Sequence, residues 1–172
     1  MFGDVLEKKQ KEKTPLNPQS PYAISKVFSH YLTQNYRNSY GIFATSGILF
    51  NHESPLRGEE FVTRKIVINL VKILNNDINF FELGNIYAKR DWGYAKEYVE
   101  AMWKILQRKK PSDYVIATGK TYSIKYFINV ATKYLKMNVK WVGKGLNEKL
   151  INKDNNTTII KINPKFFRPS EV

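Results

Sequence analysis

The sequence predicts an α/β protein in which helices alternate with strands. From Tyr22 to about Arg37, apolar residues recur at the spacing of one helix face. Gly41 then precedes an almost continuous apolar run from Ile42 to Phe50, which is typical of a strand buried on both faces. Because the helical segment leads directly into the strand, the two together indicate a parallel α/β unit.

The first helix has a clear start signal. A polar stretch over residues 7–21 ends in Ser20 and Pro21. A serine side chain can accept a hydrogen bond from a free backbone N–H of the first turn, and proline suits that turn because it has no N–H to leave unpaired. We therefore expect a long amphipathic helix from Tyr22, with one face packed on a sheet.

The alternation continues through the rest of the chain. The loop over residues 51–58 follows the first strand, where open α/β sheets place their ligands. The asparagine-rich segment at 152–156 is the clearest loop, and neither an internal repeat nor a linker between two independent cores is found. The further elements that we expect are the helices Val62–Leu74, 95–109 and Ser123–Leu135, the last of them capped by Ser123, and the strands Asn79–Leu83, Tyr114–Ala117, Asn138–Val142 and Thr157–Ile162.

Composition narrows the class of protein. At 172 residues and 42% hydrophobic, the chain can hold one domain with a substantial core, and it contains no apolar run long enough to span a membrane. Its first residues lack the charged start, apolar stretch and cleavage site of a secretory signal. The absence of cysteine excludes disulfides and thiolate metal ligands. We expect a cytoplasmic globular protein with no membrane partner.

A net charge of +13 is typical of proteins that bind the phosphate backbone of nucleic acid. The distribution of the charge argues against it, because 22 of the 28 basic residues are lysines scattered along the whole chain. Arginine is the better reader of phosphates and base edges, so this surplus is more typical of a solvated surface. We expect no nucleic-acid partner.

Tyr22 and Lys26 form a candidate proton-transfer pair. Residues four apart share a helix face, so the Lys26 ammonium can lie near the Tyr22 phenol and favour its ionised form. A phenolate is a usable general base near neutral pH. For the bare pair, a solvated helix face is the commoner explanation, and the surrounding motifs have to decide.

His52 is the second candidate, in the polar loop after the first strand. His52 and His30 are the two histidines of the chain, and His30 has no evident partner within its helix, so we expect no metal site. Ser54 lies close to His52, but no nucleophile elbow or oxyanion loop accompanies it. A serine nucleophile is therefore not predicted.

Two segments dense in hydrogen-bonding groups, 61–65 and 84–93, carry Lys65 and Arg90. These side chains could meet an anionic ligand, since a guanidinium grips phosphate through two bonds, and Arg168 could close the same site. Asp91 could instead hold Arg90 in a structural ion pair. Both interpretations stay open at this point.

Several motifs, in a fixed order, carry a resemblance to a known family. They are Ser20–Lys26, Gly47–Pro55, Phe61–Lys65, Leu83–Asn85, Ala88–Gly93, Tyr98–Trp103, Ile116–Gly119 and Phe167–Val172. Together they closely resemble the GDP-mannose 4,6-dehydratase family of extended short-chain dehydrogenases/reductases, essentially end to end. The Tyr-x-x-x-Lys pattern marks the superfamily, whereas the runs Asn51–Pro55 and Lys89–Gly93 are specific to this dehydratase and close relatives.

The resemblance implies a fold and an assembly. It implies a partial Rossmann-like sheet unit plus a smaller mixed α/β substrate-binding domain. Residues 1–60 would be the C-terminal part of the NADP-binding Rossmann domain, and 61–172 mainly the GDP-sugar-binding domain. Segments near 78–93 and 114–119 would be interleaved with the cofactor domain. Full-length members of the family would be homo-oligomers, either dimers or tetramers.

The resemblance also implies a lyase reaction. NADP would take a hydride from C4 of GDP-mannose, water would leave across C5 and C6, and the hydride would return to C6. The product would be GDP-4-keto-6-deoxymannose, a precursor of GDP-fucose and related deoxysugars.

Site residues follow from the same resemblance. Tyr22 would be the base at the C4 hydroxyl, and Lys26 would orient the nicotinamide ribose. Arg57 would suit the extra phosphate of NADP, although Leu56 stands where many relatives carry a second arginine. The implied cofactor contacts are Tyr22, Lys26, Leu49, Asn51, His52 and Arg57, and the implied GDP-sugar contacts are Asn51, Val62, Lys65, Gly84, Arg90, Arg168 and Glu171.

In the family, a segment carrying a catalytic threonine and glutamate directly precedes the Met-Phe-Gly that is residues 1–3 here, and the glycine-rich phosphate loop lies still earlier. We therefore expect a fragment that is inactive alone and that exposes the apolar run Ile42–Phe50, with low stability as a result. The alternatives are a non-catalytic remnant that binds a nucleotide sugar, and a related nucleotide-sugar dehydratase or epimerase.

Overall fold

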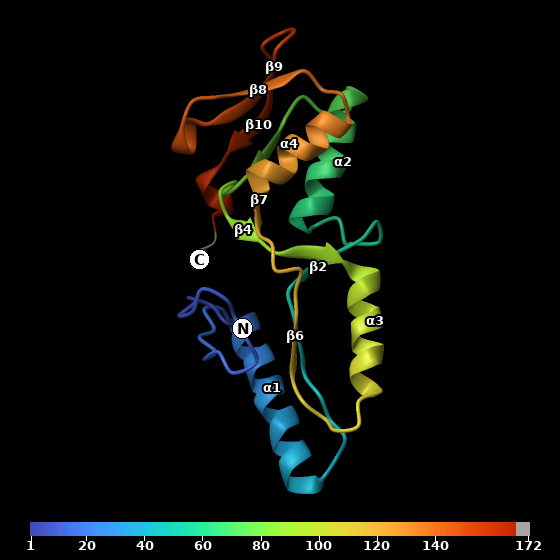
Figure 1. The fold of residues 1–172 in the computed structure, drawn as a ribbon. Helices are drawn as coiled ribbons and strands as arrows, with labels where there is room; N and C mark the ends of the chain where they lie inside the picture. Colours follow the sequence, from blue (N-terminus) through green and yellow to red (C-terminus); the bar gives the residue numbers. More distant parts are fainter. Residues whose placement is uncertain (168–172) are drawn as a thin grey trace. The chain divides into compact units, whose positions relative to one another are not determined.

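A computed structural model describes residues 1–167, and these form two compact units (Figure 1). Unit 1 consists of residues 1–54 and 91–120, and unit 2 of residues 55–90 and 121–167. Each unit is built from two separate stretches of chain, so no single linker separates them. Among the described residues, no helix is both long and apolar enough to cross a membrane.

Unit 1 opens on helix α1 (Pro21–Tyr40). The predicted start is confirmed: Ser20 Oγ accepts a hydrogen bond from the Ala23 amide at 3.1 Å, and Pro21 occupies the first turn. The helix continues three residues beyond Arg37 and ends at Gly41, whose φ of 64° is readily adopted by glycine.

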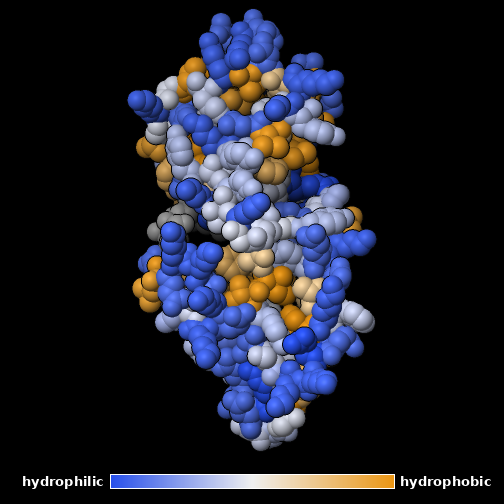
Figure 2. Space-filling view, in the orientation of Figure 1, coloured by the Kyte–Doolittle hydropathy of each residue, from blue (hydrophilic) through white to orange (hydrophobic). Residues whose placement is uncertain are grey.

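The expectation that α1 packs one face on a sheet is wrong for this chain. His30 is its buried residue. The strands of unit 1 pair only two by two, and such narrow ribbons offer little surface to cover a 20-residue helix. In α1, the large hydrophobic side chains that are 43% or more exposed are Tyr22, Ile24, Phe28, Tyr31, Leu32, Tyr36 and Tyr40. Figure 2 shows hydrophobic residues at the surface among the hydrophilic ones on the face that it draws.

The remaining elements of unit 1 are β1 (Gly47–Leu49), β2 (Asn51–Glu53), β5 (Trp92–Tyr94), α3 (Ala95–Leu106) and β6 (Tyr114–Ile116). Strand β1 pairs in parallel with β6, and β2 pairs in parallel with β5. The parallel pairing expected from the sequence is confirmed here.

The expected strand Ile42–Phe50 is wrong in its extent. Residues 41–46 have no regular structure, and the side chains of Ile42 and Phe43 are 48% and 43% exposed, whereas Ile48 is buried. The run breaks at Phe50, whose amide donates to the Ile116 carbonyl at 2.9 Å before the chain passes from partner β6 to partner β5. The start of the expected 51–58 loop is therefore strand β2.

Unit 2 packs helices α2 (Val62–Leu74) and α4 (Ile124–Tyr134) beside a four-stranded sheet (Figure 1). The sheet order is β3 (Phe81–Leu83), β10 (Thr158–Ile162), β9 (Lys149–Asn152) and β8 (Val139–Val142). Strands β3 and β10 are parallel, and the others are antiparallel, so the sheet is mixed. The fully buried side chains of this core are Ile66, Leu70, Ile86, Ile128, Leu150, Ile159 and Ile160.

Smaller elements complete unit 2: a two-stranded antiparallel pair of β4 (Lys89–Arg90) with β7 (Tyr122–Ser123), and the short 3-10 turns η1 (Gly145–Asn147) and η2 (Pro164–Phe166). The predicted cap of α4 is confirmed, because Ser123 Oγ accepts from the Tyr126 amide at 3.1 Å. The predicted bounds of α2 match the structure, and the α/β class is confirmed. Strand β9 was not predicted.

Candidate functional site

The structure places Tyr22 and Lys26 on one face of α1. The Lys26 Nζ lies 5.3 Å from the centre of the Tyr22 ring, and the Tyr22 side chain is 72% exposed. The exposed ring is accessible to a ligand, and the Lys26 ammonium lies against it as a cation–π contact. The shared helix face predicted from the four-residue spacing is therefore confirmed.

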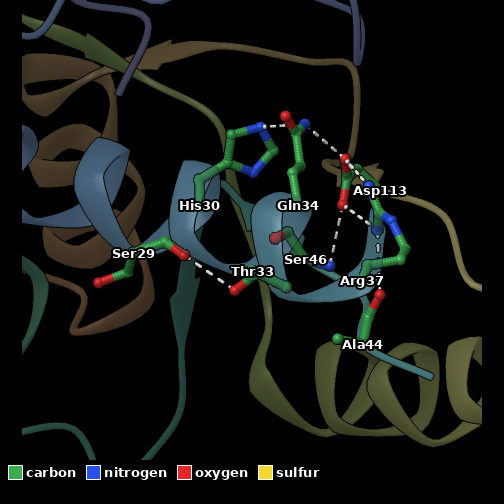
Figure 3. Close-up of polar contacts among 8 residues, drawn as sticks. All are labelled: Ser29, His30, Thr33, Gln34, Arg37, Ala44, Ser46 and Asp113. Atoms are coloured by element: carbon green, nitrogen blue, oxygen red, sulfur yellow. Dashed lines mark hydrogen bonds and ion pairs between the residues drawn. The ribbon is translucent and has the colours of Figure 1, made fainter. Parts of the chain in front are cut away.

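A polar network anchors α1 on the side of His30 (Figure 3). The sequence showed no partner for His30, but the side-chain amide of Gln34 lies 3.0 Å from His30 Nε2 and donates to Asp113 Oδ2 at 2.8 Å. Arg37 donates to both Asp113 oxygens, at 2.9 and 3.0 Å. Asp113 also accepts from the Ser46 amide at 3.1 Å, so one carboxylate joins α1 to the start of β1.

The environment of Asp113 favours its charged form. Burial raises the pKa of this carboxyl, but hydrogen bonds from Arg37 and Gln34, the Arg37 charge and the Ser46 amide lower it further, to about 2. The network is therefore charged and intact at neutral pH, and it holds the helix that carries Tyr22.

His52 lies in β2 with its imidazole fixed on two sides. Its Nδ1 is 2.9 Å from the Phe50 carbonyl oxygen, so Nδ1 must carry the proton, and the neutral ring then presents Nε2 as an acceptor. The ring stacks on Tyr98, with centroids 5.0 Å apart and planes inclined by 26°. His52 is held in one orientation, as a ligand-contacting imidazole requires.

Gly93 makes room for that stack. It pairs with His52 across the β2–β5 ladder, and a Cβ at this position would lie 2.3 Å from Cε2 of Tyr98. Tyr98 is 3% exposed. Burial raises the pKa of the Tyr98 phenol, and the nearby carboxylates of Asp91 and Glu97 add to the effect. Tyr98 is therefore a neutral platform beneath His52.

Asp91 has a structural role in unit 1. Its carboxylate accepts from the Thr118 amide at 3.0 Å, from Thr118 Oγ1 at 2.8 Å and from the Gly119 amide at 2.8 Å. Asp91 thus fixes the turn that follows β6. Its sequence neighbour Arg90 belongs to unit 2, where the Arg90 guanidinium donates to the Lys89 carbonyl at 2.7 Å.

In unit 2, the start of α2 meets the end of β3 at Phe166. Lys65 Nζ lies 4.9 Å from the centre of the Phe166 ring. A Cβ on Gly84 would lie 2.4 Å from the Phe166 carbonyl oxygen, so glycine permits this close approach. The candidate segments 61–65 and 84–93 therefore both approach Phe166.

The N-terminus of α2 suits an anion. Its N-cap residue, Phe61, makes no side-chain capping bond, and the first turn has no acidic residue, whereas α1 and α4 are capped by serines. Backbone N–H groups and the helix dipole favour negative charge at such an end. With Val62 and Lys65 in the first turn, this end of unit 2 is a candidate phosphate site.

Arg57 is held against an aromatic ring. Its guanidinium carbon lies 3.5 Å from the centre of the Phe61 ring. Stacking of this kind orients the plane of the guanidinium, whose N–H edge is the part that binds phosphate oxygens. The arrangement fits the cofactor-phosphate role expected of Arg57.

The predicted site residues fall into both units. Unit 1 holds Tyr22, Lys26, Leu49, Asn51 and His52, and unit 2 holds Arg57, Val62, Lys65, Gly84 and Arg90. Arg168 and Glu171 lie outside the described residues. Within residues 1–167, no group of three His, Cys, Asp or Glu side chains could hold a metal ion. Sequence reasoning did not identify Tyr98 or Phe166 as site residues, because their roles depend on contacts across the fold.

Comparison with known proteins then decides the family. The family described as GDP-mannose 4,6 dehydratase matches residues 1–172. The chain belongs to this family. The GDP-mannose 4,6 dehydratase of Drosophila melanogaster is 50% identical over 172 residues, which cover 100% of this chain and 44% of the fly protein. The human enzyme of the same name is 45% identical, with 100% of this chain and 46% of the human protein covered.

Solved structures agree on the fold. The chain is similar to RMD from Pseudomonas aeruginosa complexed with NADPH, with a TM-score of 0.77 and 19% identity over 95% of this chain and 51% of that one. It is also similar to a UDP-N-acetylglucosamine 4-epimerase from Methanobrevibacter ruminantium M1, with a TM-score of 0.75 and 19% identity over 99% and 48% of the two chains. The chain spans about half the length of the curated relatives that it matches.

Proposed function

We propose that this protein acts as a GDP-mannose 4,6-dehydratase, to which the chain contributes a catalytic tyrosine, cofactor contacts and most of a GDP-sugar site. The reaction would convert GDP-mannose into GDP-4-keto-6-deoxymannose and water. The observation that carries the proposal is the family match over all 172 residues, which includes every candidate position. Relatives from fly and human with this name are 45% to 50% identical to the chain.

Unit 1 would serve the cofactor and the proton transfer, as the Rossmann-like part of the fold. Bound NADP would supply the acceptor and later the donor of hydride. Tyr22 would take the proton of the C4 hydroxyl of the sugar, and Lys26 would stabilise the phenolate and orient the ribose. Leu49, Asn51 and His52 would line the nicotinamide side, where the Nε2 of His52 can accept a hydrogen bond. The fixed imidazole supports this assignment.

Unit 2 would serve the GDP-sugar. Lys65 and the start of α2 at Val62, where Phe61 makes no side-chain capping bond, would bind the diphosphate. Gly84 would allow the close approach of the backbone at Phe166. Arg90 would add a second charge, and the resemblance assigns Asn51 a further contact with the GDP-sugar. Arg168 and Glu171 complete the proposed set.

Arg57 would bind the extra phosphate that distinguishes NADP from NAD. Its stacking on Phe61 supports this role, since the guanidinium is already oriented. Leu56 stands where many relatives carry a second arginine. We therefore expect this protein to prefer NADP over NAD less strongly than those relatives do. We further propose that the protein is cytoplasmic and that the complete enzyme is a homo-oligomer.

Calorimetry with GDP-mannose on the purified chain tests the proposal. We expect saturable binding that Lys65→Met weakens by about tenfold or more, because a charge-assisted bond to phosphate is lost. Tyr22→Phe is the matched control: it removes the proposed base and should leave the affinity unchanged. A wild-type chain that binds neither GDP-mannose nor GDP would contradict the assignment of unit 2.

A further inference from the structure

A charged cluster in unit 2 stands outside the residues assigned above. Glu148 is 4% exposed, and its carboxylate accepts hydrogen bonds from the Lys125 ammonium at 2.6 Å and from the Tyr87 hydroxyl. Burial raises the pKa of Glu148, but the bonds from Lys125 and Tyr87 and the Lys125 charge lower it more. Glu148 is therefore an ionised carboxylate with both of its oxygens bonded.

Aromatic rings enclose the lysine of this cluster. Lys125 Nζ lies 5.3 Å from the centre of the Tyr87 ring and 5.0 Å from that of Trp141. Trp141 is itself fixed, because its Nε1 donates to the Asn129 side-chain oxygen at 2.8 Å. The cluster thus joins α4, β8 and the segment after β3 at one point.

The loop that delivers Glu148 has glycines where its backbone requires them. Gly143 and Gly145 have φ values of 79° and 58°, which residues with a Cβ rarely adopt. A Cβ on Gly143 would also lie 2.4 Å from the Asn147 carbonyl oxygen. The tight path through η1 therefore places the carboxylate with little freedom.

Tyr87 lies in the short irregular segment 84–88 that links β3 to β4, with Gly84 at its start and Arg90 in the strand that follows it. The start of α4 holds this segment through its backbone: the Lys125 amide donates to the Ile86 carbonyl at 2.7 Å, and the Ile124 amide donates to the Ala88 carbonyl at 3.2 Å. Ile86 and Ala88 are buried, whereas Tyr87 is half exposed. The Tyr87 hydroxyl bond to Glu148 thus anchors, through a side chain, a stretch that has a proposed ligand residue at each end.

A buried ion pair contributes little net stability, because apolar residues of similar size often stabilise a protein equally well. Its better-attested use is to fix one arrangement of the chain. We propose that Glu148 is a positioning residue for the GDP-sugar site, acting through Tyr87 and Lys125 to hold the segment that carries Gly84 and Arg90. This inference rests on the proposed function of unit 2.

The test uses GDP as the probe, with calorimetry at a temperature at which all variants remain folded. Glu148→Gln should weaken GDP binding by about tenfold, because small displacements of ligand-contacting groups are costly. Tyr87→Phe keeps the ring beside Lys125, removes one hydroxyl and should give a smaller loss. Ile128→Val is the control: it should lower the melting temperature by removing one buried methylene in α4, without changing GDP affinity.

Hydrogen exchange at the Ile124 and Lys125 amides gives a second readout that needs no ligand. Glu148→Gln and Tyr87→Phe should raise exchange there more than Ile128→Val does. Unchanged exchange and unchanged GDP affinity in Glu148→Gln would overturn the positioning role. Failure of the wild-type chain to bind GDP, with exchange altered as expected, would instead overturn the proposed function of unit 2.

Discussion

Asp113 offers a quantitative test of how unit 1 holds the helix of Tyr22. Its pKa is lowered from 3.8 to about 2 in the folded chain. Each pKa unit corresponds to about 1.4 kcal/mol, so the charged network contributes about 2.5 kcal/mol at neutral pH. The side chains of Asp113 and its partner Arg37 are 11% and 16% exposed, so solvent screens the pair little. Asp113→Asn should therefore lower the free energy of unfolding by about 2.5 kcal/mol.

The pH dependence follows from the sign of the shift. A carboxyl whose pKa is depressed on folding stabilises the protein above the unfolded value of 3.8, and this contribution is lost as pH falls toward about 2. Urea unfolding followed by circular dichroism should show the full difference between wild type and Asp113→Asn above about pH 5. The two curves should converge as the pH falls through the folded pKa.

Glu100→Gln is the matched control for this experiment. Glu100 pairs with Lys104 at 2.6 Å on the surface of α3, where both side chains are more than half exposed. Its loss should change stability far less than Asp113→Asn does, because solvent screens the exposed pair. A loss below about 1 kcal/mol for Asp113→Asn, or a difference that persists unchanged at low pH, would refute the charged anchor.

Three further substitutions test other contacts. Gly93→Ala should destabilise unit 1 by about 1 to 3 kcal/mol, because the new Cβ meets the Tyr98 ring, and thermal melting measures this. Ser20→Ala should cost about 1 kcal/mol by removing the cap of α1, which urea unfolding followed by circular dichroism would detect. Gly84→Ala should reduce GDP binding in calorimetry, because a Cβ would push against the Phe166 backbone. An unchanged affinity would show that GDP binding does not depend on the close approach of Gly84 to Phe166.

Local signals in the sequence predicted the helices well. Ser20 and Ser123 accept the capping bonds expected of them, and α2 has its predicted bounds. Such signals depend on residues one turn apart, so they can be recognised in the sequence without knowledge of the fold. The face shared by Tyr22 and Lys26 was predictable for the same reason.

Features that depend on distant partners could not be predicted. The apolar run from Ile42 indicated a longer strand, because composition does not show how many neighbouring strands a segment finds. Asp113 gave no signal of its role, since its partners lie 67 or more positions earlier in the chain. Tyr98 and Phe166 likewise acquire their roles from His52, Lys65 and Gly84, which only the fold brings near them.

Turnover in a chimera tests the central claim most directly. Replacing the matching part of the Drosophila melanogaster relative with residues 1–172 would place Tyr22 and Lys65 in a complete enzyme of the family. We predict conversion of GDP-mannose to its 4-keto-6-deoxy product, abolished by Tyr22→Phe, with GDP-mannose binding retained in that variant. A folded chimera that binds GDP-mannose and NADP but forms no product, or one whose Tyr22→Phe variant turns over normally, would contradict the account.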